Sequence, residues 1–372
     1  MDTANWLAVV VVGLMLLGVV MVYSAGANPE REPNWGQFWK YASLRQVVFG
    51  PLAVLVMLLG SRVPMRWWRI GRYGISLSTV LLAVAVAGLV LVLVPSIGVE
   101  VNQARRWLRL GADGYGVGFQ PSELAKIALV IFLAAFYARP GAKAREFWRG
   151  FVPGAVAVGT VACLIAKEDF GTGALVAVVG GLMMAAGGVR LWWLGSLVGP
   201  GAAGFYFLVY LEPKRWERLT AFWNEVGYQL QQSKIAIGSG GWGGLGLGRG
   251  VQKYGYVPED TTDFVFAIIG EELGLIGCGL VVVAFVILLM LAVKIVGQAS
   301  SKLGRLMAFG LAMMIGLQAG MHIGVDIGAL PAKGISLPFV SAGGTGLVLM
   351  GLAAGLIMSA GRSKWEEIGL RL

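Results

Sequence analysis

Charged residues are scarce in this chain of 372 residues. Asp, Glu, Lys and Arg together make up 13% of it, about half the share that is usual in water-soluble domains, so a string of soluble domains is excluded. Histidine occurs once and cysteine twice. One histidine cannot supply a histidine metal site. Cys163 and Cys278 lie in separate apolar runs, where packing is a more common role than a disulfide bridge.

Long apolar runs take the place of the missing charge. Hydrophobic residues make up 57% of the sequence, and runs of roughly twenty residues, enough to cross a hydrocarbon layer of about 30 Å, recur throughout it. The 57 glycines suit a membrane bundle, because small residues let helices approach closely. We therefore expect an all-α integral membrane protein, a single domain over residues 1–372 with about ten transmembrane helices. The predicted spans are 5–24, 43–60, 75–95, 121–138, 150–166, 173–189, 191–211, 264–293, 305–330 and 336–360.

Basic residues are concentrated in three short connections. Residues 61–74 contain Arg but no acid, residues 139–150 contain a single acid, and residues 294–305 contain only basic charges. Lys and Arg accumulate in cytoplasmic loops, so this pattern predicts a multi-pass membrane protein with both termini cytoplasmic. The net charge of +10 then reflects topology and attraction to anionic lipid. A nucleic-acid partner would need an exposed basic domain, and none is present.

Polar residues gather on the opposite, outer side. Three outer segments are predicted: residues 95–120, residues 167–173, and a loop of residues 212–263 that is far longer than an ordinary connection. Loops of that length on a rigid scaffold usually carry function. The glycine-rich stretch 238–250 lacks the Gly-Lys-Ser/Thr ending of a phosphate-binding loop, so a re-entrant or interfacial loop with close backbone approach is favoured.

Several ionisable residues lie at span ends on this outer side. Each would cost about 2.5–3.5 kcal/mol in the middle of a bilayer, so we expect them to line a hydrated cavity open to the outside. They are Glu123, Lys126, Asp169, Asp263, Asp326 and Lys333. Glu123 and Lys126 share one helical face and could equally form a structural ion pair. At least one of Glu271 and Glu272 must face protein or water, and His322 is expected to have a hydrogen-bonded packing role.

Five motifs occur in a recognisable order along the chain. They are Phe119-Gln-Pro-Ser-Glu-Leu-Ala-Lys126, Gly227-Tyr-Gln-Leu-Gln-Gln-Ser233, Ile237-Gly-Ser-Gly-Gly241, Tyr256-Val-Pro-Glu-Asp-Thr-Thr-Asp-Phe264 and Leu330-Pro-Ala-Lys-Gly-Ile-Ser-Leu-Pro-Phe-Val-Ser341. On these motifs the whole chain resembles the shape, elongation, division and sporulation (SEDS) family. Residues 20–25, 252–253 and 331–334 resemble the FtsW-type members more than the RodA-type members.

The resemblance implies a ten-span peptidoglycan glycosyltransferase that polymerises lipid II at the outer face of the plasma membrane. It also implies a class B penicillin-binding protein as partner, together with other membrane proteins of the division or elongation machinery. The family's essential aspartate falls on Asp263, and its other motif residues fall on Glu123, Lys126 and Asp169. The chain departs from the family pattern at Thr261, Thr262, His322, Asp326 and residues 341–346.

The chemistry of this reaction assigns roles to the outer residues. A carboxylate can take the proton of the attacking sugar hydroxyl, and cations can stabilise the charge on the departing diphosphate. We predict Asp263 as the catalytic base. The predicted substrate-binding residues are Arg105, Arg106, Glu123, Lys126, Asp169, Arg215, Arg218 and Lys333. No metal ligands are predicted, and the sequence leaves open whether a divalent cation takes part. A lipid II flippase and a scaffold for division proteins are the alternative functions.

The predicted topology can be tested with single cysteines. We expect a cysteine at position 66 to be protected from an impermeant thiol reagent in intact cells, and one at position 225 to react, because the basic loops alternate in that phase. Labelling of position 66 without cell lysis would contradict the topology.

Overall fold

The computed structural model describes residues 2–26, 41–69, 76–101, 104–110, 117–224, 227–256, 261–331 and 333–369. Within these ranges nine helices are long and apolar enough to cross a membrane, and a tenth apolar helix is shorter. The multi-pass helical fold is thereby confirmed. The first five spans are α1 (Thr3–Ala25), α2 (Ala42–Gly60), the shorter α3 (Leu77–Val92), α4 (Pro121–Ala138) and α5 (Val152–Glu168) with the π-helical turn Phe147–Phe151 before it.

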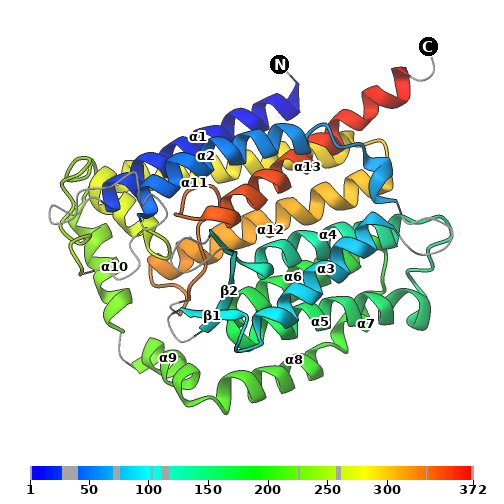
Figure 1. The fold of residues 1–372 in the computed structure, drawn as a ribbon, viewed down its shortest axis with the longest axis horizontal. Helices are drawn as coiled ribbons and strands as arrows, with labels where there is room; N and C mark the ends of the chain where they lie inside the picture. The colour runs from blue at the N-terminus through cyan, green and yellow to red at the C-terminus, as the bar shows by residue number, and fades with distance from the viewer. Residues whose placement is uncertain are drawn as a thin grey trace.

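The remaining spans follow in the second half of the chain. They are α6 (Phe170–Gly187), the segment Leu191–Tyr210 that joins α7 (Leu191–Gly195), α8 (Val198–Phe205) and a π-helical turn, then α11 (Val265–Gln298), α12 (Lys302–Asp326) and α13 (Gly344–Gly369). Helix α12 is central and packs against α4, α6, α11 and α13. Helix α8 lies apart along the lower edge of Figure 1, and most side chains of its span are exposed.

Glycines permit a close crossing between two helices of the bundle. Helix α13 packs along α2, and a Cβ atom added to Gly351 would lie 2.5 Å from the carbonyl oxygen of Ala53. The same crossing places Gly355 against the backbone of Met57. Any side chain at these positions would push the two helices apart, which explains part of the high glycine content.

The segment 95–120 departs from the predicted all-α fold. It contains an antiparallel sheet of β1 (Gly98–Val101), β2 (Ala104–Leu110) and β3 (Val117–Phe119), in that order. The sheet lies near the ends of α3 and α4 in Figure 1. Strand pairing satisfies backbone groups that a loop against a membrane would leave open. Through Gln120 the sheet leads directly into α4.

Several predicted boundaries also differ, and one predicted loop contains helices. Helix α6 begins at Phe170 rather than at residue 173, because Asp169 caps it. The last span begins at Gly344 rather than at residue 336, because Pro338 disfavours a helical residue before it. The long loop 212–263 is partly helical, with α9 (Pro213–Asn224) and α10 (Tyr228–Ser239). The labelling position Glu225 lies outside the described residues.

Helix α11 is broken at Gly274, where the backbone adopts φ 68° and ψ −166°. The glycine-rich stretch supplies the hydrogen bonds that the break removes. Leu275 N–H donates to the carbonyl of Gly241 at 2.9 Å, and the N–H groups of Leu245 and Gly246 donate to the carbonyls of Glu271 and Glu272 at 2.9 and 3.0 Å. The predicted close backbone approach of this loop is confirmed.

The adjacent carboxylates also bind the glycine-rich loop. Glu271 accepts hydrogen bonds from the N–H groups of Val251 and Gln252. Glu272 pairs with Lys253 at 2.9 Å and accepts from the Ser24 hydroxyl of α1 at 2.5 Å. Both carboxylates are buried, so both face protein, and they join α1, α11 and the loop.

The break in α11 predicts a sharp difference between two glycine substitutions. Gly274→Ala should lower the free energy of unfolding by at least about 1–3 kcal/mol, because only glycine readily adopts this conformation and its Cβ would lie 2.6 Å from Trp242 O. Gly279→Ala is the matched control, since Gly279 is in the same helix with open space around it. Thermal unfolding in detergent would measure both. Equal melting temperatures would contradict the prediction.

Candidate active site

Strand β2 and the junction between α5 and α6 bring two predicted site residues together. Arg106 Nη1 lies 3.4 Å from Asp169 Oδ2, and Arg106 Nη2 donates to the carbonyl of Glu168 at 2.8 Å. Asp169 also accepts from the backbone N–H and the hydroxyl of Thr172, at 3.1 and 2.9 Å. The carboxylate is therefore held by the first turn of α6 and by a cation.

The loop between α12 and α13 brings two more predicted residues to the same place. A Cβ atom added to Gly334 would lie 3.0 Å from Asp263 Oδ2 and 3.3 Å from Arg106 Nη1. The residue before Gly334, Lys333, lies over the ring of Phe170, with its Nζ 5.4 Å from the ring centroid. Burial lowers the pKa of the Lys333 ammonium, and the Asp169 carboxylate opposes that shift. We call Arg106, Asp169, Asp263 and Lys333 the polar cluster.

The start of α11 bears on the role of Asp263. An aspartate before an apolar helix is a favoured N-cap, which is the structural alternative to catalysis at this position. The helix begins at Val265, and its N-cap residue, Phe264, makes no side-chain cap. The N–H of Ala267 in the first turn instead donates to Asp326 Oδ2 of α12 at 3.1 Å. Asp326 of α12 therefore supplies a side-chain acceptor to this turn.

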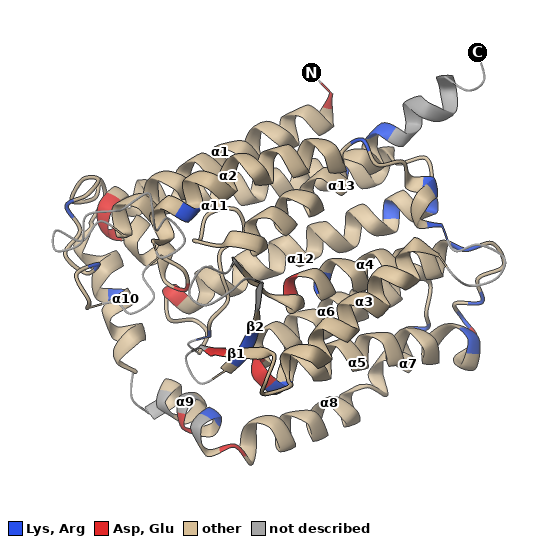
Figure 2. Ribbon diagram, in the orientation of Figure 1, with Lys and Arg blue, Asp and Glu red and all other residues tan. Residues whose placement is uncertain are grey.

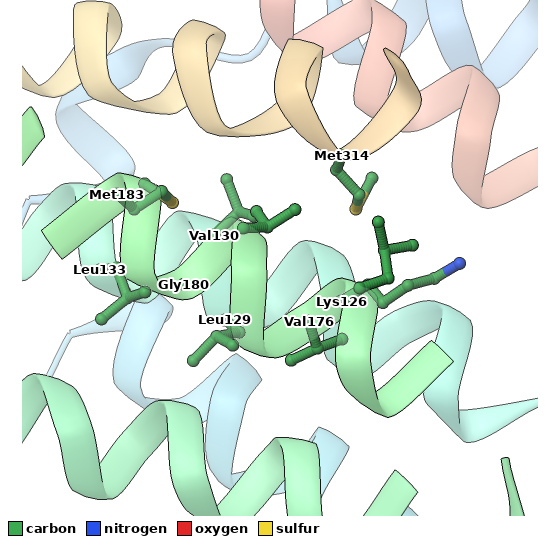
Figure 3. A pocket seen from close by; sticks show the side chains of 10 residues that line it. Lys126, Leu129, Val130, Leu133, Val176, Gly180, Met183 and Met314 are labelled. Atoms are coloured by element: carbon green, nitrogen blue, oxygen red, sulfur yellow. The ribbon is translucent and has the colours of Figure 1, made fainter. Parts of the chain in front are cut away.

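Glu123 and Lys126 form a buried ion pair rather than part of the polar cluster. Their charged atoms are 2.8 Å apart, and Lys126 Nζ also donates to Gln318 Oε1 at 2.7 Å. Gln318 in turn donates to the carbonyl of Ser336 at 2.9 Å. Figure 3 shows the Lys126 nitrogen pointing away from a pocket lined by apolar residues such as Leu129, Val176 and Met314.

The expectation of an open hydrated cavity is wrong for four of the six residues: Glu123, Lys126, Asp169 and Asp326 are 7%, 3%, 7% and 0% exposed. Protein groups take the place of water around them. The Lys126 ammonium pairs with Glu123 and donates a hydrogen bond to Gln318. The Asp326 carboxylate accepts a hydrogen bond from a backbone N–H of α11. His322 has the hydrogen-bonded packing role that the sequence predicted, with Nδ1 2.6 Å from the carbonyl of Ile335.

The other predicted arginines have separate surroundings. Arg105 pairs with Glu100 at 3.3 Å, and its backbone N–H donates to Glu168 Oε2. Arg215 donates to the carbonyls of Ala166, Lys167 and Leu208, so it satisfies the end of α5. The Arg218 side chain lies outside the described part of the structure.

Sequence reasoning missed three residues that shape the site. Glu168 binds both neighbouring arginines, Gln318 extends the Lys126 pair, and Gly334 leaves room for Asp263 beside Arg106. Gly334 had a usable signal, because it lies within the motif that also carries Lys333. A polar Gln318 within an apolar span was a second signal. Among the described residues, no three His, Cys, Asp or Glu side chains form a group that could hold a metal ion.

The fold and the site define a class: a polytopic membrane protein whose acidic and basic side chains meet at helix breaks near one end of the bundle. The family model described as cell cycle protein, FtsW/RodA/SpoVE, matches residues 5–366. The chain therefore belongs to this family.

Two curated relatives are named probable peptidoglycan glycosyltransferase FtsW. The one from Burkholderia thailandensis is 39% identical, over 92% of this chain and 74% of the relative. The one from Thioalkalivibrio sulfidiphilus is 37% identical, over 97% and 90%. The expected likeness to FtsW-type members is confirmed.

Two solved structures share the fold. One, described as "Structural coordination of polymerization and crosslinking by a peptidoglycan synthase complex", is 26% identical with a TM-score of 0.76, over 97% of this chain and 98% of that one. Rod shape determining protein RodA of Thermus thermophilus is 26% identical with a TM-score of 0.68, over 96% of each chain.

The buried Glu123–Lys126 pair predicts a strong effect on stability. Lys126→Met should cost about 3–5 kcal/mol, because it leaves the Glu123 carboxylate buried without its partner, and the double variant Glu123→Gln/Lys126→Met should recover much of this loss. Lys143→Met is the control, since Lys143 and Glu146 form an exposed pair with the same sequence spacing. Thermal unfolding would compare them. Equal effects at both pairs would argue against a buried pair.

Proposed function

We propose that this chain is a peptidoglycan glycosyltransferase that polymerises lipid II at the outer face of the plasma membrane during cell division or elongation. The observation that carries the proposal is the polar cluster, which places the Asp263 carboxylate at the head of α11 beside Arg106, with Lys333 near Asp169 on the adjoining loop. The family and the names of the relatives agree with this chemistry.

In the proposed reaction, the acceptor sugar hydroxyl attacks the anomeric carbon of the donor and the lipid diphosphate leaves. Asp263 accepts the hydroxyl proton as general base, a role that typically contributes about 10²–10⁴-fold in rate. Arg106 and Lys333 supply positive charge for the departing diphosphate. Asp169 positions Arg106 through their 3.4 Å ion pair. Glu123 and Lys126 support the site indirectly, through Gln318 and the loop that carries Lys333.

The distribution of charge supports the proposed orientation. Figure 2 shows Lys and Arg gathered at the end where both termini lie, and acidic residues mainly toward the other end and the sheet. Cytoplasmic loops are rich in Lys and Arg. The end with the termini is thus cytoplasmic in our proposal, and the polar cluster is extracytoplasmic.

The two alternative functions differ from a polymerase in their needs. A flippase needs polar groups along the full depth of the bundle, whereas the pocket beside Lys126 is apolar. A scaffold would not need the arrangement around Asp263. Purified protein with lipid II separates the three, as polymer, translocation or neither. We expect polymer.

A partner is part of the proposal. One structural neighbour belongs to a peptidoglycan synthase complex that combines polymerisation and crosslinking, and we propose that a class B penicillin-binding protein assembles with this chain. Polymerase activity should rise when the two are purified together, because a partner helix can pack on the apolar surface of the bundle. A lipid II polymerisation assay with and without each co-encoded candidate measures this. No increase with any of them would contradict the prediction.

Substitution of Asp263 tests the catalytic assignment. Asp263→Asn should lower the rate of polymerisation by about two or more orders of magnitude, because the amide cannot accept the proton. Insertion and partner binding should persist, because the Ala267 N–H in the first turn of α11 bonds to Asp326. Glu146→Gln, an exposed carboxylate change near the basic end, should leave the rate unchanged. A near wild-type rate for Asp263→Asn would leave Asp169 as the next candidate base.

A further inference from the structure

The last two turns of α12 contain a buried pair that the proposed mechanism does not use. His322 and Asp326 are four residues apart on one helical face, and their side chains are completely buried. His322 Nε2 lies 3.5 Å from Asp326 Oδ2. Among the residues that the structure describes, neither His322 Nε2 nor Asp326 Oδ1 has a hydrogen-bond partner. Buried polar atoms in this condition call for a physical explanation.

The hydrogen bond on the other side of the ring fixes the tautomer. His322 Nδ1 lies 2.6 Å from the carbonyl oxygen of Ile335. A carbonyl oxygen can only accept, so Nδ1 carries a proton and donates it. In a neutral ring Nε2 then presents a lone pair to Asp326, and an ionised carboxylate there would also present a lone pair. Two acceptors that face each other in a buried site repel, unless one further proton lies between them.

The pair also connects the two segments that form the polar cluster. Through its ring, His322 holds the carbonyl of Ile335, next to Lys333 and Gly334. Through its carboxylate, Asp326 holds the N–H of Ala267, four residues after Asp263. The Asp263 and Asp326 carboxyl groups are close enough to interact electrostatically. In addition, the backbone carbonyl of Asp326 accepts from the Ser233 hydroxyl of α10 at 2.7 Å.

We propose that His322 and Asp326 share one proton and act as a positioning pair that holds the head of α11 and the loop of Lys333 against each other. With the proton in place, the 3.5 Å contact becomes an attractive one, and both links from α12 are held in one geometry. Asp263 and Lys333 are then kept at a fixed separation by a helix that touches neither reacting sugar. The effect on catalysis rests on the proposed function, whereas the shared proton and the two links do not.

Two substitutions of Asp326 separate positioning from chemistry. His322 Nε2 and the Ala267 N–H both face the same atom, Asp326 Oδ2. The Asp326→Asn side chain can therefore keep one of these two contacts, with either its oxygen or its nitrogen at that place, but not both. This variant should polymerise at a rate between those of the wild type and Asp326→Leu, which breaks both links and should lose roughly tenfold to 100-fold in kcat. If Asp326→Asn were as inactive as Asp326→Leu, the carboxylate itself would be required and the positioning role would be overturned.

The single histidine allows the pair to be observed without any activity. Full-length protein labelled with ¹⁵N-histidine gives ring signals from His322 alone, since the chain has one histidine. We expect Nδ1 to carry a proton in the wild type and in Asp326→Asn, and we expect the Nε2 resonance to move markedly in Asp326→Leu, where its partner is gone. A wild-type Nε2 signal identical to that of Asp326→Leu, or a bare Nδ1, would refute the shared proton.

Hydrogen exchange measures the two links directly and remains informative if Asp326→Leu inserts poorly, because His322→Leu removes the Ile335 link alone. Amide protection around residues 264–268 and 333–337 should fall in both segments in Asp326→Leu and in no more than one of them in Asp326→Asn. In His322→Leu only the 333–337 segment should lose protection. Unchanged exchange in His322→Leu would overturn the positioning role. If the spectra and the exchange come out as expected but the wild-type protein makes no polymer, the proposed function is refuted and the shared proton of His322 and Asp326 still stands.

Discussion

Backbone hydrogen bonding at the breaks between helices is the constraint on which this structure depends. A bilayer offers no water to an open N–H or carbonyl group, so each break must be satisfied by other parts of the protein. At the end of α5, Arg106 and Arg215 donate hydrogen bonds to the backbone carbonyls of the last turn. At the start of α6, Asp169 takes the N–H and hydroxyl of Thr172. At the break in α11, backbone groups of the glycine-rich loop hydrogen-bond to the free backbone groups of the helix. The side chains of two glutamates beside the break hold the loop in turn.

The polar cluster forms where these breaks meet. Charged side chains are costly in a membrane protein, and here they are retained mostly as partners for backbone groups and for one another. Arg106 shows how one side chain can do both, since it binds the Glu168 carbonyl and the Asp169 carboxylate. The requirements of folding and of the proposed diphosphate chemistry therefore converge on the same few residues. This convergence explains why a functional assignment needs substitutions that keep the hydrogen bonds.

Much of the fold could be predicted from the sequence, because span length and loop charge depend on local composition. The helices came out near their predicted positions, and Arg106, Asp169, Asp263 and Lys333 were predicted and lie together. The sheet at residues 98–119 was missed, since its strands are short and strand pairing depends on non-local contacts. Arg215 and Lys126 resemble substrate-binding cations in sequence. Only packing shows that one satisfies a helix end and the other is neutralised by Glu123.

The break at Gly274 also divides α11 by length. At 1.5 Å per residue, the part from Gly274 to Gln298 measures about 36 Å, slightly more than the hydrocarbon thickness of about 30 Å. That part alone is long enough to cross the membrane. The turns from Val265 to Leu273 can thus extend beyond the hydrocarbon layer as a separate short helical segment. In the proposed orientation, Glu271, Glu272 and the residues before them then lie in the headgroup layer, at the depth of the diphosphate of the proposed substrate.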